Sequence, residues 1–464
     1  MLYREPNQNK SGEERSERIG SMPSLTPLHE TYCRWDRTPP SQADVLEGLA
    51  QLVNTKVNDS MRDLLKALQR EVLSTVFGIS EQRSRRFQQI RYVDKIHKFS
   101  SHALENYGHY LIAPSLRRVI ERFPGLHHKP LTPSLHFLVS VLNGVLGDYL
   151  LQQHNPMALP MVLYDHYGEL QKGDLAGHVT IFVHGLCTNH LHWSTRRYEG
   201  IGEKLLSQRD HNTMLYLNYN TGRRISANGR SLANTLEDLV SRNPNITSIN
   251  LIGHSMGGLV SRSALFYGKQ NMHHWLQMTE NLVCLGSPHH GAGLERFGFT
   301  LQEKMGRFPF VKIVGYLVNI RSNGILDLRH GSVRDDDWEH NAVRIGFMDD
   351  NRKPAPIPSH IKTFLVAGTI EFENRHNKAL RILGDYLVSV KSALGEHPNS
   401  RYRLKVPESN KAIFYGLNHL DIQYHPLVAE QIARWFYPEP KENRSDKVHE
   451  YMLHLNHMDG IAMT

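Results

Sequence analysis

The sequence predicts an α/β fold in which a mostly parallel central sheet is flanked by helices and preceded by a helical region. Three observations support this prediction. Apolar residues recur every three or four positions from Leu46 to Val72, the spacing of one helical face. Short apolar, β-rich runs bounded by Gly or Asn begin near residue 178, and helical patterns such as 231–243 separate them. Buried strands that alternate with helices indicate parallel pairing through crossovers.

The chain before the sheet has two parts. Residues 1–43 combine Glu, Arg, Ser, Asn and Pro with few apolar side chains, so we expect a disordered tail. A helical N-terminal region is expected over 44–155. Its most apolar stretch, 135–151, contains Asn143 and Asp148, which favours a core helix over a membrane-surface element.

The α/β domain is expected over 170–438. The segment 292–358 interrupts its alternation of strands and helices and is interpreted as a lid or cap insertion over one end of the sheet. Residues 439–464 form a polar, His-rich C-terminal tail. The expected strands are 178–185, 213–220, 246–253, 281–288, 360–369 and 411–417.

Composition places the chain of 464 residues in the ordinary globular class, with 40% hydrophobic and 22% charged residues. A net charge of +8 favours anionic partners such as an anionic membrane surface. The basic stretch 81–98 is interleaved with Asp and Gln, which favours a solvated helix face, and no nucleic-acid partner is expected. The three cysteines are widely spaced, and neither an apolar leader nor an uninterrupted apolar run of about 18 residues is present. We therefore expect a cytoplasmic protein, with peripheral contact with an anionic membrane as an open alternative.

A candidate nucleophile lies in the segment GHSMG, residues 253–257. A bare GxSxG is a weak signal, but here it follows an expected strand and opens a helix, which is the geometry of a nucleophile elbow. Such a turn strains the backbone of Ser255. It requires Gly253 and Gly257, because a Cβ at either position would clash with the neighbouring strand or helix. We predict that Ser255 is a nucleophile and that His254 belongs to the same elbow; a plain strand-to-helix turn is the alternative.

A nucleophilic serine also needs donors for the oxyanion. The expected donors are the backbone N–H groups of Met256 and of Leu186, which follows the strand end His184-Gly185. Gly185 lets the chain turn toward the serine, and His184 is expected to support the loop by hydrogen bonding. Cys187 is interpreted as a buried small residue.

Two further histidines in this loop, His190 and His192, form an HxH pattern. No third ligand stands at a recognisable spacing, so the pattern favours a polar loop and no metal site is predicted.

A base and an acid are expected downstream of the serine, in the chain order of an elbow enzyme. His419 follows the last expected strand and is the candidate base. The acid should follow the preceding strand, where Asp385 is favoured over Glu371 and Glu373, since a loop could bury the Asp385 carboxylate against the imidazole.

With these three residues in that order, the sequence resembles the α/β-hydrolase superfamily over roughly residues 178–438. The segments VTIFVHGL, NLIGHSMGGLVSR, LVCLGSPHHGAGLER, GDYLVSVKSALG and GLNHLDI are similar to its lipase and GPI inositol-deacylase-like branch. The Gly-Asp-x-Leu-Val pattern at 384–388 further favours Asp385. The sequence departs from the superfamily in the oxyanion loop, which is a short His-Gly-Leu-Cys in place of a glycine-rich HGGG. The N-terminal helical region is not part of the common fold.

The resemblance implies a carboxylic ester hydrolase that uses no cofactor and acts on lipid-like acyl esters. The apolar side chains of the insertion 292–358 suit an acyl chain, although a packed cap core explains them equally well. Two alternatives remain: an acyltransferase that uses the same triad, and a non-catalytic binding protein on a hydrolase scaffold.

Overall fold

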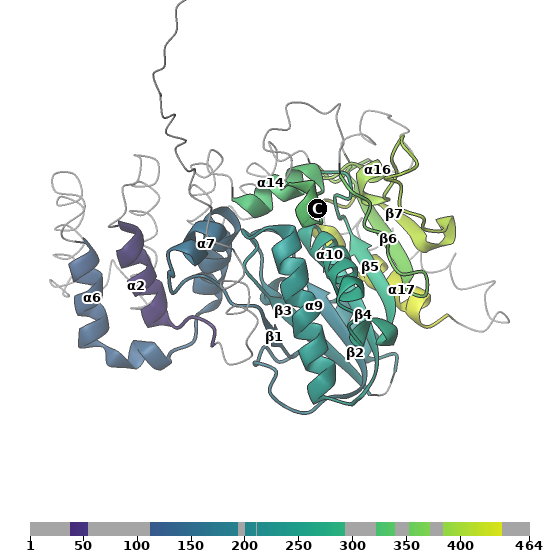
Figure 1. Cartoon of the computed structure of the whole chain (residues 1–464). Helices are drawn as coiled ribbons and strands as arrows, with labels where there is room; N and C mark the ends of the chain where they lie inside the picture. Colours follow the sequence, from purple (N-terminus) through teal and green to yellow (C-terminus); the bar gives the residue numbers. More distant parts are fainter. Residues whose placement is uncertain are drawn as a thin grey trace, which may run out of the picture.

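A computed structural model describes seven parts of the chain, shown in Figure 1. They are residues 38–53, 112–193, 200–209, 211–292, 322–338, 352–371 and 384–438. The expected C-terminal tail, the stretch 81–98 and nearly all of the expected N-terminal tail lie outside these residues. So do two large pieces of the insertion, 293–321 and 339–351.

A seven-stranded sheet forms the centre of the described structure, in the order β1-β3-β2-β4-β5-β6-β7. Neighbouring strands are parallel except β1, which pairs with β3 in the antiparallel sense. The predicted fold class is therefore confirmed. The strands are β1 (Val162–Tyr164), β2 (Ala176–Val183), β3 (Asn212–Asn218), β4 (Asn245–His254), β5 (Thr279–Leu285), β6 (Lys362–Thr369) and β7 (Lys411–Tyr415). The short edge strand β1 was not among the expected strands.

Helices cover both faces of this sheet (Figure 1). α9 (Ile225–Arg242) and α10 (Met256–Gln270) pack against each other on one face, and α8 (Ile201–Leu206) packs with α17 (Pro426–Phe436) on the other. The other helices in the described part of the α/β domain are α11 (Trp275–Met278), α14 (Asn323–His330) and α16 (Val390–Ala393). Short 3₁₀ turns are η1 (Pro124–His128), η2 (His190–Trp193), η4 (Asp335–Asp337), η5 (Glu408–Asn410) and η6 (Asp421–Gln423).

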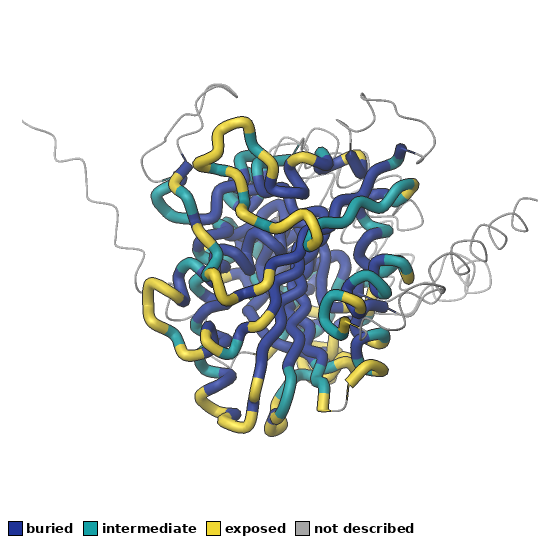
Figure 2. The backbone as a smooth tube through the Cα atoms, turned by 90° about the vertical axis from the view of Figure 1, so that its right-hand side faces the viewer, coloured by how far each residue is buried: buried dark blue, intermediate teal, exposed yellow. Residues whose placement is uncertain are grey.

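The strands contribute alternate residues to two hydrophobic clusters, as the period-2 geometry of a strand requires. Ile181, Leu251 and Leu365 lie in the cluster that includes α9 and α10. Their immediate neighbours Phe182, Ile252 and Val366 lie in the cluster that includes α8 and α17. Figure 2 shows the central strands as a continuous buried layer with exposed segments at its rim.

In the described part of the chain, three helices precede the sheet: α2 (Gln42–Val53), α6 (Ile112–Arg122) and α7 (Pro133–Gln152). α2 and α6 contact each other through an ion pair in which Arg117 Nη2 lies 3.0 Å from Glu47 Oε1. Among the described residues, α7 is the one helix long and apolar enough to cross a membrane by those two criteria. Most of α7 is nevertheless buried, and Leu138, Leu142 and Leu150 belong to the same cluster as the sheet. α7 is therefore a core helix.

Candidate active site

Ser255 occupies a sharp turn between the end of β4 and the first residue of α10. Its backbone has φ 54° and ψ −122°, a conformation that is costly for any residue with a Cβ. The turn is tied to the sheet because the Ser255 N–H donates to the Leu285 carbonyl over 2.8 Å. This geometry is that of a nucleophile elbow.

The glycines around Ser255 allow backbones to approach closely. A Cβ on Gly253 would lie 2.4 Å from the Gly258 nitrogen, and one on Gly257 would lie 1.9 Å from the Val183 carbonyl oxygen. Both neighbours are backbone atoms that cannot swing aside. A Cβ on Gly185 would lie 3.0 Å from the Cβ of Ser255, so the loop after β2 also packs directly against the serine.

His419 and Asp385 form a buried pair. His419 Nδ1 lies 2.7 Å from Asp385 Oδ2, and the two residues are 2% and 0% exposed. The other carboxylate oxygen, Oδ1, accepts the backbone N–H groups of Leu387 at 3.0 Å and Val388 at 2.9 Å. The carboxylate is therefore held by its own turn, with one oxygen left for the imidazole.

Two contacts bring this pair to the elbow. His254, next to the serine, donates its Nε2–H to the backbone carbonyl of His419 over 2.8 Å, and the two rings lie 4.9 Å apart. Gly286 follows Leu285, whose carbonyl accepts the Ser255 N–H, and has φ 55°. A Cβ on Gly286 would lie 3.3 Å from His419 Cε1 and 3.2 Å from Asp385 Oδ2. Ser255, Asp385 and His419 thus follow the carboxyl ends of β4, β6 and β7, at the same end of the sheet.

Sequence reasoning did not anticipate either contact. Gly286 stands in the Gly-Ser-Pro run directly after β5, and a glycine at the end of a buried strand is the signal that could have identified it. Of the competing acids, Glu371 also follows β6 and is 1% exposed, whereas Glu373 lies outside the described residues.

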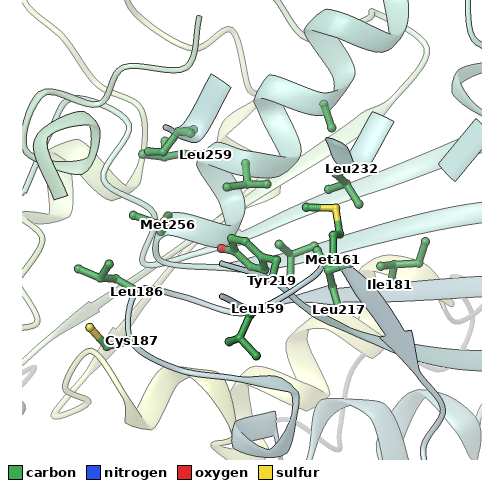
Figure 3. Packing of buried hydrophobic residues seen from close by; sticks show 14 of the residues in the cluster. Leu159, Met161, Ile181, Leu186, Cys187, Leu217, Tyr219, Leu232, Met256 and Leu259 are labelled. Carbon is green, nitrogen blue, oxygen red and sulfur yellow. The ribbon is translucent and has the colours of Figure 1, made fainter. Parts of the chain in front are cut away.

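The loop after β2 positions the amide expected to bind the oxyanion. Neighbouring amides are engaged: Cys187 N–H donates to Thr221 Oγ1 at 3.3 Å, and Gly258 N–H to Ser255 O at 3.2 Å. Within the described ranges, the N–H groups of Leu186 and Met256 donate to no other protein group. Figure 3 shows the side chains of both residues in one buried cluster with Cys187, which anchors the peptide groups that carry these amides.

His184 and His254 are uncharged supports of these loops. Burial lowers the pKa of His184 to about 3 and that of His254 well below its ordinary value. His184 donates its Nδ1–H to the Gly185 carbonyl at 2.9 Å, and its own carbonyl accepts the Tyr219 hydroxyl at 2.7 Å. His184 therefore holds the turn into the oxyanion loop.

The other candidates in the loop have structural environments. Burial raises the pKa of the Cys187 thiol to about 12, so it is a packing residue. His190 stacks on Tyr164, with ring centroids 3.7 Å apart, and His192 pairs with the Asn189 amide oxygen at 2.9 Å. Within the described ranges, no group of three or more His, Cys, Asp or Glu side chains could hold a metal ion.

The sheet order and the elbow are those of the α/β-hydrolase fold. Residues 174–397 match the model of a family described as "PGAP1-like alpha/beta domain". This match confirms the expected resemblance over these residues. Ser255 and Asp385 lie inside the matched segment, while His419 and helices α2, α6 and α7 lie outside it. No curated protein matches the chain.

Solved structures similar to this chain include three hydrolases. A lipase of Bacillus licheniformis, BlEst2 in mature form, is 18% identical over 60% of this chain and 97% of its own, with a TM-score of 0.37. The carboxylesterase CesB of Bacillus subtilis is 11% identical over 60% and 88%, with a TM-score of 0.34. The naproxen esterase of Bacillus subtilis is 14% identical over 60% and 87%, with a TM-score of 0.33.

Proposed function

We propose that this protein is a serine hydrolase that cleaves carboxylic esters through an acyl-enzyme. Ser255 is the nucleophile, His419 the base and Asp385 the orienting acid. The observation that carries the proposal is the buried 2.7 Å contact between His419 and Asp385, beside a serine held in an elbow. Strained backbone conformations such as the positive φ of Ser255 cluster at active sites, which supports this role.

In the proposed first half-reaction, the Ser255 hydroxyl attacks the ester carbonyl carbon and His419 Nε2 takes its proton. The Nδ1–H of the resulting imidazolium is stabilised by Asp385. The new oxyanion accepts the N–H groups of Leu186 and Met256, each worth about 10²–10³ in rate in comparable enzymes. The tetrahedral intermediate collapses, the C–O bond to the alcohol breaks, and His419 returns the proton to the leaving alkoxide.

In the second half-reaction, water attacks the acyl-Ser255 carbonyl and gives a proton to His419. The C–O bond to Ser255 then breaks, the proton returns to the serine oxygen, and the carboxylic acid leaves. This cycle needs no cofactor. As substrates we propose lipid-like acyl esters, on the basis of the family resemblance and of the apolar composition of 292–358.

The test is hydrolysis of a series of p-nitrophenyl esters of increasing acyl chain length. We expect Ser255→Ala to lose about 10⁴-fold or more in kcat. Ser207→Ala is the matched control: its hydroxyl bonds the Lys204 carbonyl at 2.8 Å on the surface, and it should retain full activity. Hydrolysis that survives in Ser255→Ala would refute the mechanism, and a parent protein inactive on every ester would favour a binding role. A product ester formed with an added alcohol would identify an acyltransferase.

A further inference from the structure

Helix α7, from the N-terminal region, lies directly behind the oxyanion loop, which we define as residues 184–193. The helix is outside the segment that matches the α/β domain family. It nevertheless contacts three loops at the carboxyl ends of the strands. The Gly147 carbonyl accepts a hydrogen bond from the Asn220 side-chain amide at 2.8 Å, and the Gly144 carbonyl accepts one from the Ser322 hydroxyl at 2.7 Å.

The closest approach is between Gly144 of α7 and Cys187 of the oxyanion loop. A Cβ on Gly144 would lie 2.2 Å from the Cys187 Sγ, 3.1 Å from its nitrogen and 3.2 Å from its Cα. The Sγ also lies 3.9 Å from the Val141 carbonyl oxygen. A side chain on Gly144 would therefore meet both the Cys187 sulfur and the backbone of the loop.

Cys187 itself holds an uncommon backbone conformation, with φ 60°. Its N–H is fixed to Thr221 Oγ1, and its side chain is wedged against α7. Leu186, the expected oxyanion donor, lies between this fixed residue and Gly185, which packs against Ser255. The orientation of the Leu186 peptide group is thus fixed by both neighbours: by Gly185, which packs against Ser255, and by Cys187, which packs against α7.

A second attachment lies one turn earlier on the helix. The buried Asn189 side chain donates to Ser140 Oγ at 3.0 Å, and Ser140 in turn donates to the His136 carbonyl at 2.7 Å. The ring of His136 meets that of His190 edge to face, with centroids 5.1 Å apart. The loop is therefore attached to α7 at Cys187, Asn189 and His190.

We propose that α7 is part of the catalytic unit: Gly144 and Ser140 are positioning residues that hold the Leu186 amide where the oxyanion forms. This inference rests on the proposed function. The inference gives the N-terminal region the role of holding the oxyanion donor. In α/β hydrolases with an HGGG-type motif, a glycine-rich loop of the α/β domain has that role.

The test is Gly144→Ala, measured on the best ester of the series. The added methyl group must push Cys187 away, so we expect kcat to fall by about 10²-fold, the value of one misplaced oxyanion donor. KM should stay within about twofold, because the donor acts on the transition state. Affinity for a trifluoromethyl ketone, whose hemiketal oxygen mimics the oxyanion, should fall in parallel with kcat/KM.

Rescue separates this role from general destabilisation. Cys187→Ala removes the 2.2 Å clash with the sulfur and leaves the tight contacts with the Cys187 backbone, so the double variant Gly144→Ala/Cys187→Ala should recover part of the lost kcat. Gly147→Ala is the matched control: its Cβ would meet Asn220 Oδ1 at 1.8 Å, and Cys187→Ala should not relieve its defect. If Gly144→Ala does not fold, Ser140→Ala, which removes the hydroxyl's bonds to Asn189 and to the His136 carbonyl, should lower kcat at unchanged KM.

Two outcomes would overturn the inference while leaving the proposed function intact. One is an active parent whose Gly144→Ala variant folds and keeps its kcat. The other is a double variant no more active than Gly144→Ala alone. If the parent shows no ester hydrolysis, or if Ser255→Ala remains active, the proposed function fails and this inference fails with it.

Discussion

Replacing Asp385 by asparagine tests the candidate acid at the level of single hydrogen bonds. Oδ1 accepts two backbone N–H groups, from Leu387 and Val388, and Oδ2 faces His419 Nδ1. An asparagine must place its one carbonyl oxygen toward the two amides. The reverse orientation would leave buried donors facing each other, at a cost of about 1–3 kcal/mol for each unsatisfied group.

With the oxygen committed to the amides, the asparagine NH₂ group points at His419 Nδ1. The imidazole must then carry its proton on Nε2, where it cannot accept the proton of Ser255. In a comparable triad this wrong tautomer lowers kcat by about 10⁴-fold, or about 5 kcal/mol of transition-state stabilisation. The fold should persist, since the two backbone contacts at Oδ1 are kept.

The assay is steady-state hydrolysis of an activated ester, with thermal melting of each variant. Glu371→Gln is the control, because Glu371 follows the same strand and was the competing acid. We expect kcat to fall about 10⁴-fold for Asp385→Asn and to change little for Glu371→Gln. The opposite pattern, with Asp385→Asn folded and fully active, would refute the assignment of the acid.

Two predictions concern stability. Gly257→Ala should unfold or inactivate the protein, because its Cβ would lie 1.9 Å from a backbone oxygen. Gly125→Ala is the control: its Cβ would have no atom within 4 Å, so the free energy of unfolding should shift by less than about 0.5 kcal/mol. Equal melting temperatures of the two variants would contradict this prediction. Acid should also destabilise the fold, because four buried histidines stay neutral in the native state. In the unfolded chain the same imidazoles bind protons with the ordinary histidine pKa of about 6.5. The native pKa of two of them is about 3. The loss of stability should begin as pH falls below about 6.5, and these four groups alone should contribute up to about 5 kcal/mol per pH unit, measured as urea midpoints. A midpoint that is flat between about pH 7 and 5 would show that these groups are protonated in the fold. The four are His184, His190, His254 and His289.

Sequence alone was informative where a structure depends on residues close together in the chain. The elbow is such a case: an apolar run, a serine between glycines and a helical pattern occupy one continuous stretch, 249–265. The steric need for Gly253 and Gly257 followed from the shape of that turn, and the structure supplies the atoms they would meet. The parallel sheet was likewise predicted from local apolar runs and the helices between them.

Sequence reasoning was weaker where a contact joins distant segments. Asp385 and Glu371 both follow β6, and residue order could only favour one; the turn that aims one oxygen of Asp385 at His419 is a tertiary feature. β1, with three residues, has too little pattern of its own to identify, and its strand character comes from pairing with β3. The periodicity of α7 predicted a core helix but not the neighbour it would touch.

What the sequence determined by itself was the set of elements and the chemical residues at their ends, because backbone preference and hydrophobic period are fixed within a few residues. What only the tertiary structure decided was which ends meet. The contact of Gly144 with Cys187 and the bond from His254 to His419 join segments far apart in the chain. Their choice depends on the close packing of the whole core, where one methyl group more or less at a single position decides whether two backbones can approach.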